Sequence, residues 1–376
     1  MAKPVEKIDR EALEKAIQSD EELIEDLELE KPKGSSKLAK RIGIVLFVIL
    51  NAVVIYFIAK DALSKEPPPV EPFSFANILF LLGGLMCLAV VLGCETFKYI
   101  LMMRHLGEKV SVRHAFATAA LGKYYDCITP SGAGGQPFQI WYLRSQGYSI
   151  GAASAMPLSG FFTMQFGFAG LCLLMFVFFN NAMPDPALKI TAYVGAVAYL
   201  VVPVMIIISG FAPKIAIRIV AFFVRIGAFL RIVKKPNHAI MKAMKSLNSY
   251  SRNIKRITKN KKLLIKLLLL SLVFQTAMCS MPFFAIHTFG GKIDFFTALA
   301  ACTFIQAAIS LIPTPGNSGA AEGAFYIIFS TFWPTLFWRF LCYYSFIIIG
   351  VLIYGYTALV KIIEKNKEKK ENAKSH

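Results

Sequence analysis

Charged residues are scarce in this 376-residue chain, since Lys, Arg, Asp and Glu together make up only 17% of it. An average soluble domain contains about 25% of these residues. Hydrophobic residues account for 56% of the chain and aromatic residues for 13%. This balance excludes an ordinary soluble globular protein and predicts a membrane protein with several spans.

The motifs of ATP-driven pumps and metalloenzymes are missing. No G-x-x-x-x-G-K-[ST] loop is present, because Gly122-Lys123 is followed by Tyr124 and position 117 is Ala. There is no H-E-x-x-H motif, the five histidines are scattered, and no serine nucleophile elbow is visible. We therefore predict no catalytic residue, no metal and no cofactor, and we favour a transporter over an enzyme.

Acidic residues are missing from residues 213–262, which hold fourteen Lys or Arg, whereas residues 1–30 hold eleven acids and four bases. The net charge of +18 is thus concentrated beside apolar segments, which predicts a cytoplasmic loop on an anionic leaflet and no nucleic-acid partner. Lys214, Arg218 and Arg225 share one helical face opposite isoleucines and phenylalanines, so this segment is expected to lie in the membrane interface.

Cysteines occur without metal-ligand spacing or a paired loop framework, which predicts free, buried thiols. They are Cys87, Cys94, Cys127, Cys172, Cys279, Cys302 and Cys342. The first thirty residues are charged and contain no apolar core followed by a cleavage site, so we expect no cleavable signal peptide.

The chain divides into an acidic amphipathic arm with a linker (residues 1–36), a membrane domain (37–363) and a basic tail (364–376). Six apolar runs predict about six full spans in a bacterial plasma membrane, with both termini cytoplasmic because Lys and Arg flank the cytoplasmic ends. The runs cover residues 42–59, 75–103, 156–179, 191–211, 267–289 and 335–363.

Two glycine- and proline-rich breaks interrupt the remaining apolar segments, at residues 130–137 and 313–323. The apolar run at 114–126 is too short to cross about 30 Å of hydrocarbon at 1.5 Å per residue. We predict re-entrant hairpins over 114–144 and 295–332, although the second could also be a span with a partial return. The fold class is then an all-α polytopic membrane protein with an inverted-repeat arrangement.

Broken helices in a membrane leave N–H groups at their starts that suit a phosphate, and successive glycines can add an anion-binding nest. Close helix packing through small residues is the alternative use of the same positions. The candidate lipid-binding residues at the two breaks are Gly132, Gly134, Gly135, Gln136, Pro315, Gly316, Asn317 and Gly319.

Ionisable residues at membrane depth are costly, so they usually face a partner or water. The candidates are Glu95, Lys98, Lys123, Asp126, Arg144, Glu322 and Arg339. Glu95 and Lys98 could simply pair. Glu322 could pair with Arg339, or accept a proton or a cationic head group. Arg144 and Arg339 could instead snorkel to the interface.

Three stretches resemble the signature regions of the lysylphosphatidylglycerol synthase transmembrane, or flippase-like, family. They are E-T-F-K-Y-I-L-M-M-R-H-L-G (95–107), P-S-G-A-G-G-Q-P-F-Q-I-W-Y-L-R-S-Q-G (130–147) and I-P-T-P-G-N-S-G-A-A-E-G (312–323). The similarity covers about residues 38–363, and the last stretch departs from the usual glycine-rich form at residues 317–321. The resemblance implies a stand-alone membrane unit without the synthase domain, with breaks that meet at mid-membrane.

This resemblance and the two breaks together predict translocation of an anionic or aminoacylated phosphatidylglycerol-type lipid, although a lipid-linked sugar or polyprenyl phosphate is another cargo. One alternative is an intramembrane enzyme that modifies a lipid or polyprenyl-phosphate head group. Another is a non-catalytic partner of a lipid synthase. The expected partner is a membrane phospholipid, and a synthase, another membrane protein and a second copy of the chain stay open.

Overall fold

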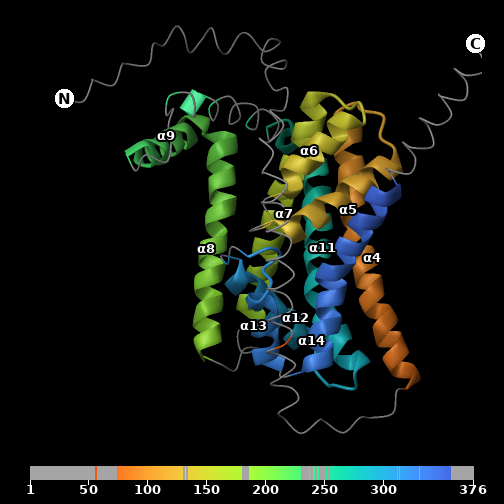
Figure 1. Ribbon diagram of the computed structural model, residues 1–376. Helices are drawn as coiled ribbons and strands as arrows, with labels where there is room; N and C mark the ends of the chain where they lie inside the picture. Colours follow the sequence, from red (N-terminus) through yellow and green to blue (C-terminus); the bar gives the residue numbers. More distant parts are fainter. Residues whose placement is uncertain are drawn as a thin grey trace, which may run out of the picture. The chain divides into compact units, whose positions relative to one another are not determined.

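The computed structural model describes residues 74–129, 134–179, 186–229, 255–310, 314–329 and 331–356. It also describes the isolated residues 56, 132, 237, 240, 241, 244, 251 and 312. These residues form helices and the turns between them, without a strand in the described part (Figure 1). The predicted arm (1–36), most of the first span (42–59) and the basic tail (364–376) lie outside the described residues.

In the part of the chain that the structure describes, four helices are long and apolar enough to cross a membrane. They are α4 (Phe75–His105), α7 (Ile150–Phe178), α11 (Lys261–Thr288), and a last helix formed by α14 (Phe332–Arg339), η2 (Phe340–Tyr344) and residues 345–356. They coincide with four of the predicted spans. The fold is therefore that of an all-helical polytopic membrane protein.

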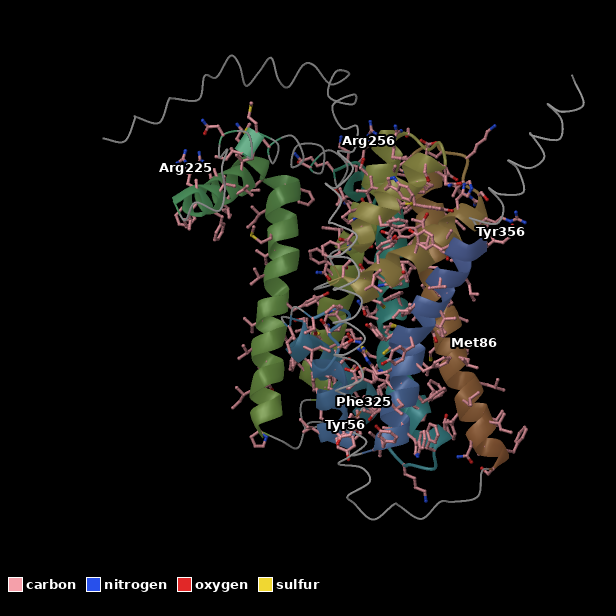
Figure 2. The ribbon with its side chains drawn as sticks, viewed as in Figure 1. Tyr56, Met86, Arg225, Arg256, Phe325 and Tyr356 are labelled. Carbon is pink, nitrogen blue, oxygen red and sulfur yellow. The ribbon has the colours of Figure 1, made fainter. Side chains whose placement is uncertain are left out.

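Helix α11 lies at the centre of the bundle, where it contacts α4, α7, α12 and α14. The outward faces of the long helices carry exposed apolar side chains, such as Leu79 and Leu82 on α4 and Leu173 on α7. Met86 is 64% exposed and points away from the bundle (Figure 2). Apolar surface of this extent suits lipid and not water.

Two pairs of shorter helices complete the bundle. The first pair is α5 (Val112–Ile128) and α6 (Gly135–Ser145), which pack antiparallel, and the second is α12 (Phe295–Ile309) and α13 (Ala320–Phe329). Their lengths of 10 to 17 residues correspond to about 15–25 Å at 1.5 Å per residue, less than a bilayer core. The helix ends at Ile128 and Ile309 agree with the predicted breaks.

The two pairs lie toward opposite ends of the bundle (Figure 1). Helix α5 begins beside the end of α4, where Ala115, Ala119 and Met103 belong to one buried cluster. Helix α12 begins beside the end of α7, where the rings of Phe179 and Phe296 stack at 5.0 Å. Because α4 and α7 run in opposite directions through the bundle, these two ends face opposite sides.

Helix α8 (Pro186–Phe211) packs against α12 and α7 and leads into α9 (Pro213–Phe229). Ile215, Phe222 and Phe223 are at least half exposed on α9, and its bases are Lys214, Arg218 and Arg225. An exposed apolar face on a basic helix is typical of interfacial helices, and the position of α9 in the membrane interface stays a prediction.

Candidate functional site

The first break is closed by side chains from the end of α5. Thr129 leaves the helix with an extended backbone, and its Oγ1 accepts a hydrogen bond of 2.9 Å from the Gly134 N–H. The Asp126 Oδ1 accepts one of 3.1 Å from the Gly135 N–H. Two of the amides that we predicted to seat a phosphate therefore have partners within the chain.

Glycine is required at position 135 because α5 and α6 approach each other closely there. A Cβ atom at this position would overlap the Asp126 carboxylate and the Gly122 carbonyl. Because glycine has no Cβ atom, the Asp126 carboxylate can reach the Gly135 N–H and cap the start of α6. At Gly132, by contrast, the φ of 61° is the feature that favours glycine.

Gln139 ties α6 to its neighbours, and sequence reasoning missed it. Its Nε2 donates to the Tyr99 hydroxyl at 2.8 Å and to the Thr118 carbonyl at 3.1 Å, and the side chain is buried. A buried amide costs free energy unless it is bonded, so this residue fixes where α6 lies on α4 and α5. The available signal was a glutamine between Phe138 and Ile140 on a short helix.

Two predicted lysines lie near Phe274 of α11, and each has an acidic residue as its neighbour. Glu95 and Lys98 form an ion pair of 2.9 Å with side chains at most 4% exposed, and the Lys98 Nζ also donates to the Ser271 Oγ at 3.3 Å. The Nζ atoms of Lys98 and Lys123 lie 5.7 and 4.8 Å from the centre of the Phe274 ring. Two lysines from different helices thus reach one aromatic ring.

Lys123 and Asp126 make a different kind of pair. The Lys123 Nζ lies 3.9 Å from the Asp126 Oδ2, and the side chains are 16% and 27% exposed. This distance exceeds the range of about 2.7–3.2 Å for an N–H···O hydrogen bond. The pair is loose and partly accessible, whereas the Glu95–Lys98 pair is tight and buried.

The second break is held by Arg339 of α14. Its Nε donates to the Glu322 Oε1 at 2.6 Å, and its Nη2 donates to the Gly316 carbonyl at 3.2 Å and the Ser318 Oγ at 3.3 Å. The Glu322 Oε2 accepts a hydrogen bond of 2.8 Å from the Gly319 N–H. The alternative in which Glu322 pairs with Arg339 is the one that the structure contains.

The loop around the second break depends on left-handed backbone. Gly316, Asn317 and Gly319 have φ angles of 55°, 55° and 90°. A Cβ atom on Gly316 would also overlap the ring of Tyr343. The Pro315 and Asn317 carbonyls accept from the Ser318 and Ala321 N–H groups, so the loop leads directly into α13.

Tyr343 links the end of α5 to the second break, and sequence reasoning did not single it out. Its hydroxyl donates to the Cys127 carbonyl at 3.3 Å, near the end of α5, and its ring lies against Gly316 and 4.2 Å from the Arg339 guanidinium carbon. It lies in the π-helix η2, a form often found at functional sites. The available signal was its position four residues after Arg339, on the same helical face.

Two predicted residues lie apart from these contacts. Arg144 is exposed near the end of α6, where its Nη1 donates to the Tyr148 carbonyl at 3.1 Å. Gln136 is half-buried in the first turn of α6. Among the described residues, no group of three or more His, Cys, Asp or Glu is arranged to hold a metal ion.

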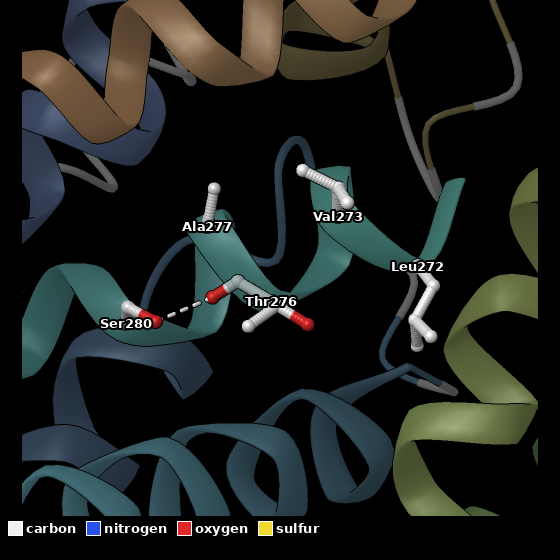
Figure 3. A pocket seen from close by; sticks show the side chains of 5 residues that line it. All are labelled: Leu272, Val273, Thr276, Ala277 and Ser280. Carbon is white, nitrogen blue, oxygen red and sulfur yellow. Dashed lines mark hydrogen bonds between the residues drawn. The ribbon is translucent and has the colours of Figure 1, made fainter. Parts of the chain in front are cut away.

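A shallow groove of about 330 Å³ lies along α11 and is lined by Leu272, Val273, Thr276, Ala277 and Ser280 (Figure 3). The Ser280 hydroxyl donates to the Thr276 carbonyl at 2.6 Å, so its hydrogen-bonding capacity is partly used within the helix. None of the predicted site residues lines this groove. The charged residues and the helix breaks define the candidate site instead.

Gly316→Ala is expected to destabilise the protein by about 1–3 kcal/mol, because a Cβ at a positive φ is strained and would also press on Tyr343. Thermal unfolding in detergent measures the effect. Gly93→Ala is the matched control, since a Cβ there meets open space. Adding Tyr343→Ala to Gly316→Ala should remove the overlap, so the two substitutions should destabilise by less than the sum of their separate effects. Additive effects would contradict the contact.

Comparison with known proteins places the chain in a family. The model of the lysylphosphatidylglycerol synthase TM region matches residues 41–350. A UPF0104 membrane protein of Archaeoglobus fulgidus is 24% identical over 344 residues, which cover 87% of this chain and 99% of that protein. One of Methanothermobacter thermautotrophicus is 22% identical over 311 residues, which cover 76% of this chain and 84% of that protein. Because the match extends over most of the sequence, the chain belongs to the lysylphosphatidylglycerol synthase transmembrane region family.

Proposed function

We propose that this protein moves a phospholipid across the plasma membrane by shielding its head group between the two helix breaks. The observation that carries the proposal is that Tyr343 contacts both the Cys127 carbonyl, in the last turn of α5 before the first break, and Gly316 in the second break. Irregular backbone at membrane depth is tolerated where protein buries it or where it lines a polar cavity. The family name, which refers to lysylphosphatidylglycerol, supports a lipid-related function.

In this proposal the α5–α6 and α12–α13 pairs are re-entrant hairpins that enter from opposite faces. Helix α8 adds a fifth span to the four long helices, and the sixth span predicted from the sequence lies mostly outside the described residues. Such inverted units are typical of transporters that bind substrate near the bilayer midplane. The lipid is an anionic or aminoacylated phosphatidylglycerol-type molecule whose acyl chains stay in the bilayer.

The charge distribution supports an orientation in which the end of α4 and the start of α11 face the cytoplasm. With six spans in alternating directions, both termini then lie on the cytoplasmic side as well. The end of α4 and the start of α11 lie together, because Met103 and Leu263 belong to one buried cluster. The basic residues near this end are Arg104, Lys109, Arg113, Lys255, Arg256, Lys261 and Lys262. Loops rich in Lys and Arg stay in the cytoplasm, so α5 and α6 enter from the cytoplasmic side and α12 and α13 from the outside.

Reconstitution tests the proposal. Liposomes that contain the purified protein should exchange a phospholipid between leaflets at least about tenfold faster than protein-free liposomes, which corresponds to about 1.4 kcal/mol off the barrier. Tyr343→Ala should reduce this acceleration because it separates the breaks, whereas Tyr356→Ala, at an exposed position, should not. Exchange no faster than in protein-free liposomes for every phospholipid tried contradicts the function.

The alternative of an intramembrane enzyme predicts a different result. Mass spectrometry of lipids from cells that overproduce the protein should show new head-group species if the protein is an enzyme. A translocator changes only the leaflet in which each species lies.

A further inference from the structure

The charged groups of the candidate site are not equally available to a ligand. Arg339 is 4% exposed and uses its Nε and Nη2 on Glu322, Gly316 and Ser318. Glu95 and Lys98 are 2.9 Å apart with side chains at most 4% exposed. A ligand would have to break these buried pairs before it could use their charges.

Lys123 and Asp126 differ from these pairs in accessibility and in distance. Their side chains are 16% and 27% exposed, and their charged atoms are 3.9 Å apart. The Lys123 ammonium has three donors, and one side of it faces the Phe274 ring. Asp126 uses Oδ1 on the Gly135 N–H, so its Oδ2 is the oxygen that faces Lys123.

The backbone amides add little to this site. Gly134 and Gly135 donate to Thr129 and Asp126, and Gly319 donates to Glu322. A phosphate at the first break would therefore bind the Lys123 ammonium rather than a nest of glycine amides.

We propose that Lys123 and Asp126 together select a phospholipid head group that carries both a phosphate and a primary ammonium group. The phosphate binds the Lys123 ammonium, and the ammonium group of the lipid binds the Asp126 Oδ2. This inference rests on the proposed function and specifies the class of lipid for the same site.

The carboxylate is the element that discriminates between lipids. A head group with a phosphate alone would place its negative charge on Lys123 and close to the Asp126 Oδ2, only 3.9 Å from the lysine nitrogen. Like charges at this range repel each other, and specificity often depends on such a repulsive element. A head group with an added ammonium turns the repulsion into an attraction.

The test uses phosphatidylethanolamine and phosphatidylglycerol, each as a minor component of phosphatidylcholine liposomes that contain the full chain. Trinitrobenzenesulfonate labels the amine of the first lipid, and periodate cleaves the diol of the second, from outside the vesicle. Lipid from the inner leaflet reacts only after it has been moved. For each variant, the initial rate for phosphatidylethanolamine is divided by the initial rate for phosphatidylglycerol.

For the wild-type chain we expect phosphatidylethanolamine to move at least about tenfold faster than phosphatidylglycerol, since one like-charge contact is replaced by an ion pair. Asp126→Asn should bring the two rates to within about threefold, because it removes the charge that discriminates. Asparagine keeps an oxygen that can accept from the Gly135 N–H, so the cap on α6 is preserved. Lys123→Met should slow both lipids.

Asp294→Asn is the matched control. Asp294 also caps a helix, because its Oδ2 accepts from the N–H groups of Phe296 and Thr297 at the start of α12. This variant should keep the wild-type ratio. A wild-type rate for phosphatidylglycerol that equals or exceeds that for phosphatidylethanolamine overturns the inference, and so does a ratio that Asp126→Asn leaves unchanged.

Binding in detergent separates this inference from the proposed function. If neither lipid moves, the result counts against the proposed function, while lipid-dependent thermal stabilisation still reports the selectivity of the site. Phosphatidylethanolamine should raise the Tm of the wild-type chain more than phosphatidylglycerol does, and Asp126→Asn should remove this difference. Equal stabilisation of the wild type by both lipids contradicts the assignment of Lys123 and Asp126.

Discussion

Arg339→Met is expected to lower the free energy of unfolding by about 3–5 kcal/mol, because it leaves a buried carboxylate without its countercharge. The Glu322 side chain is 3% exposed, and its Oε1 lies 2.6 Å from the Arg339 Nε. The same substitution removes the donor to the Gly316 carbonyl and the Ser318 hydroxyl. The loop before α13 then loses the group that holds it against α14.

Unfolding in detergent micelles, followed by circular dichroism or by a dye that reacts with buried thiols, measures this loss. The double variant Glu322→Gln, Arg339→Met should recover a large part of it, because an unpaired charge is no longer buried. Arg104→Met, at an exposed position at the end of α4, should change stability by less than about 0.5 kcal/mol. An Arg339→Met protein as stable as the wild type would show that the pair does not hold the break.

The positions of the breaks could be predicted from the sequence because glycine and proline act locally. Helix α5 ends at Ile128, just before Pro130, and α12 ends at Ile309, before Pro313. Proline costs a helix one hydrogen bond, but Pro157 and Pro282 lie inside α7 and α11. The breaks were therefore predictable from proline together with the glycines that follow it. The long apolar runs predicted α4, α7, α11 and the last helix for the same reason, since composition over about twenty residues decides a span.

The links between the breaks could not be predicted, because they depend on contacts between residues far apart in the chain. Tyr343 reaches Cys127 across 216 positions, and Lys98 reaches Ser271 across 173. The caps from Thr129 and Asp126 were missed for another reason: a glycine run suggests open amides until the neighbouring side chains are placed. Pairing of Glu95 with Lys98 was foreseen, because residues three apart on a helix are neighbours.

Lys98→Met is expected to destabilise the protein by about 3–5 kcal/mol, for the same reason as at Arg339. Lys98 is fully buried, and its ammonium bridges the Glu95 carboxylate on α4 and the Ser271 hydroxyl on α11. Loss of the lysine leaves Glu95 charged in an apolar interior, at the contact between two of the long helices. Thermal unfolding in detergent measures the effect, and Lys266→Met, at an exposed position on α11, is the matched control.

The double variant Glu95→Gln, Lys98→Met separates a structural role of this pair from a role in transport. With both charges removed, we expect stability to return to within about 1–2 kcal/mol of the wild type, since the glutamine amide is cheaper to bury than a carboxylate. If this folded variant still moves lipid at the wild-type rate, the pair serves to hold α4 against α11. Binding of the lipid head group then depends on Lys123 and Asp126, which form a longer and more accessible pair than Glu95 and Lys98. If the folded variant moves no lipid, Glu95 and Lys98 belong to the path of the head group despite their burial.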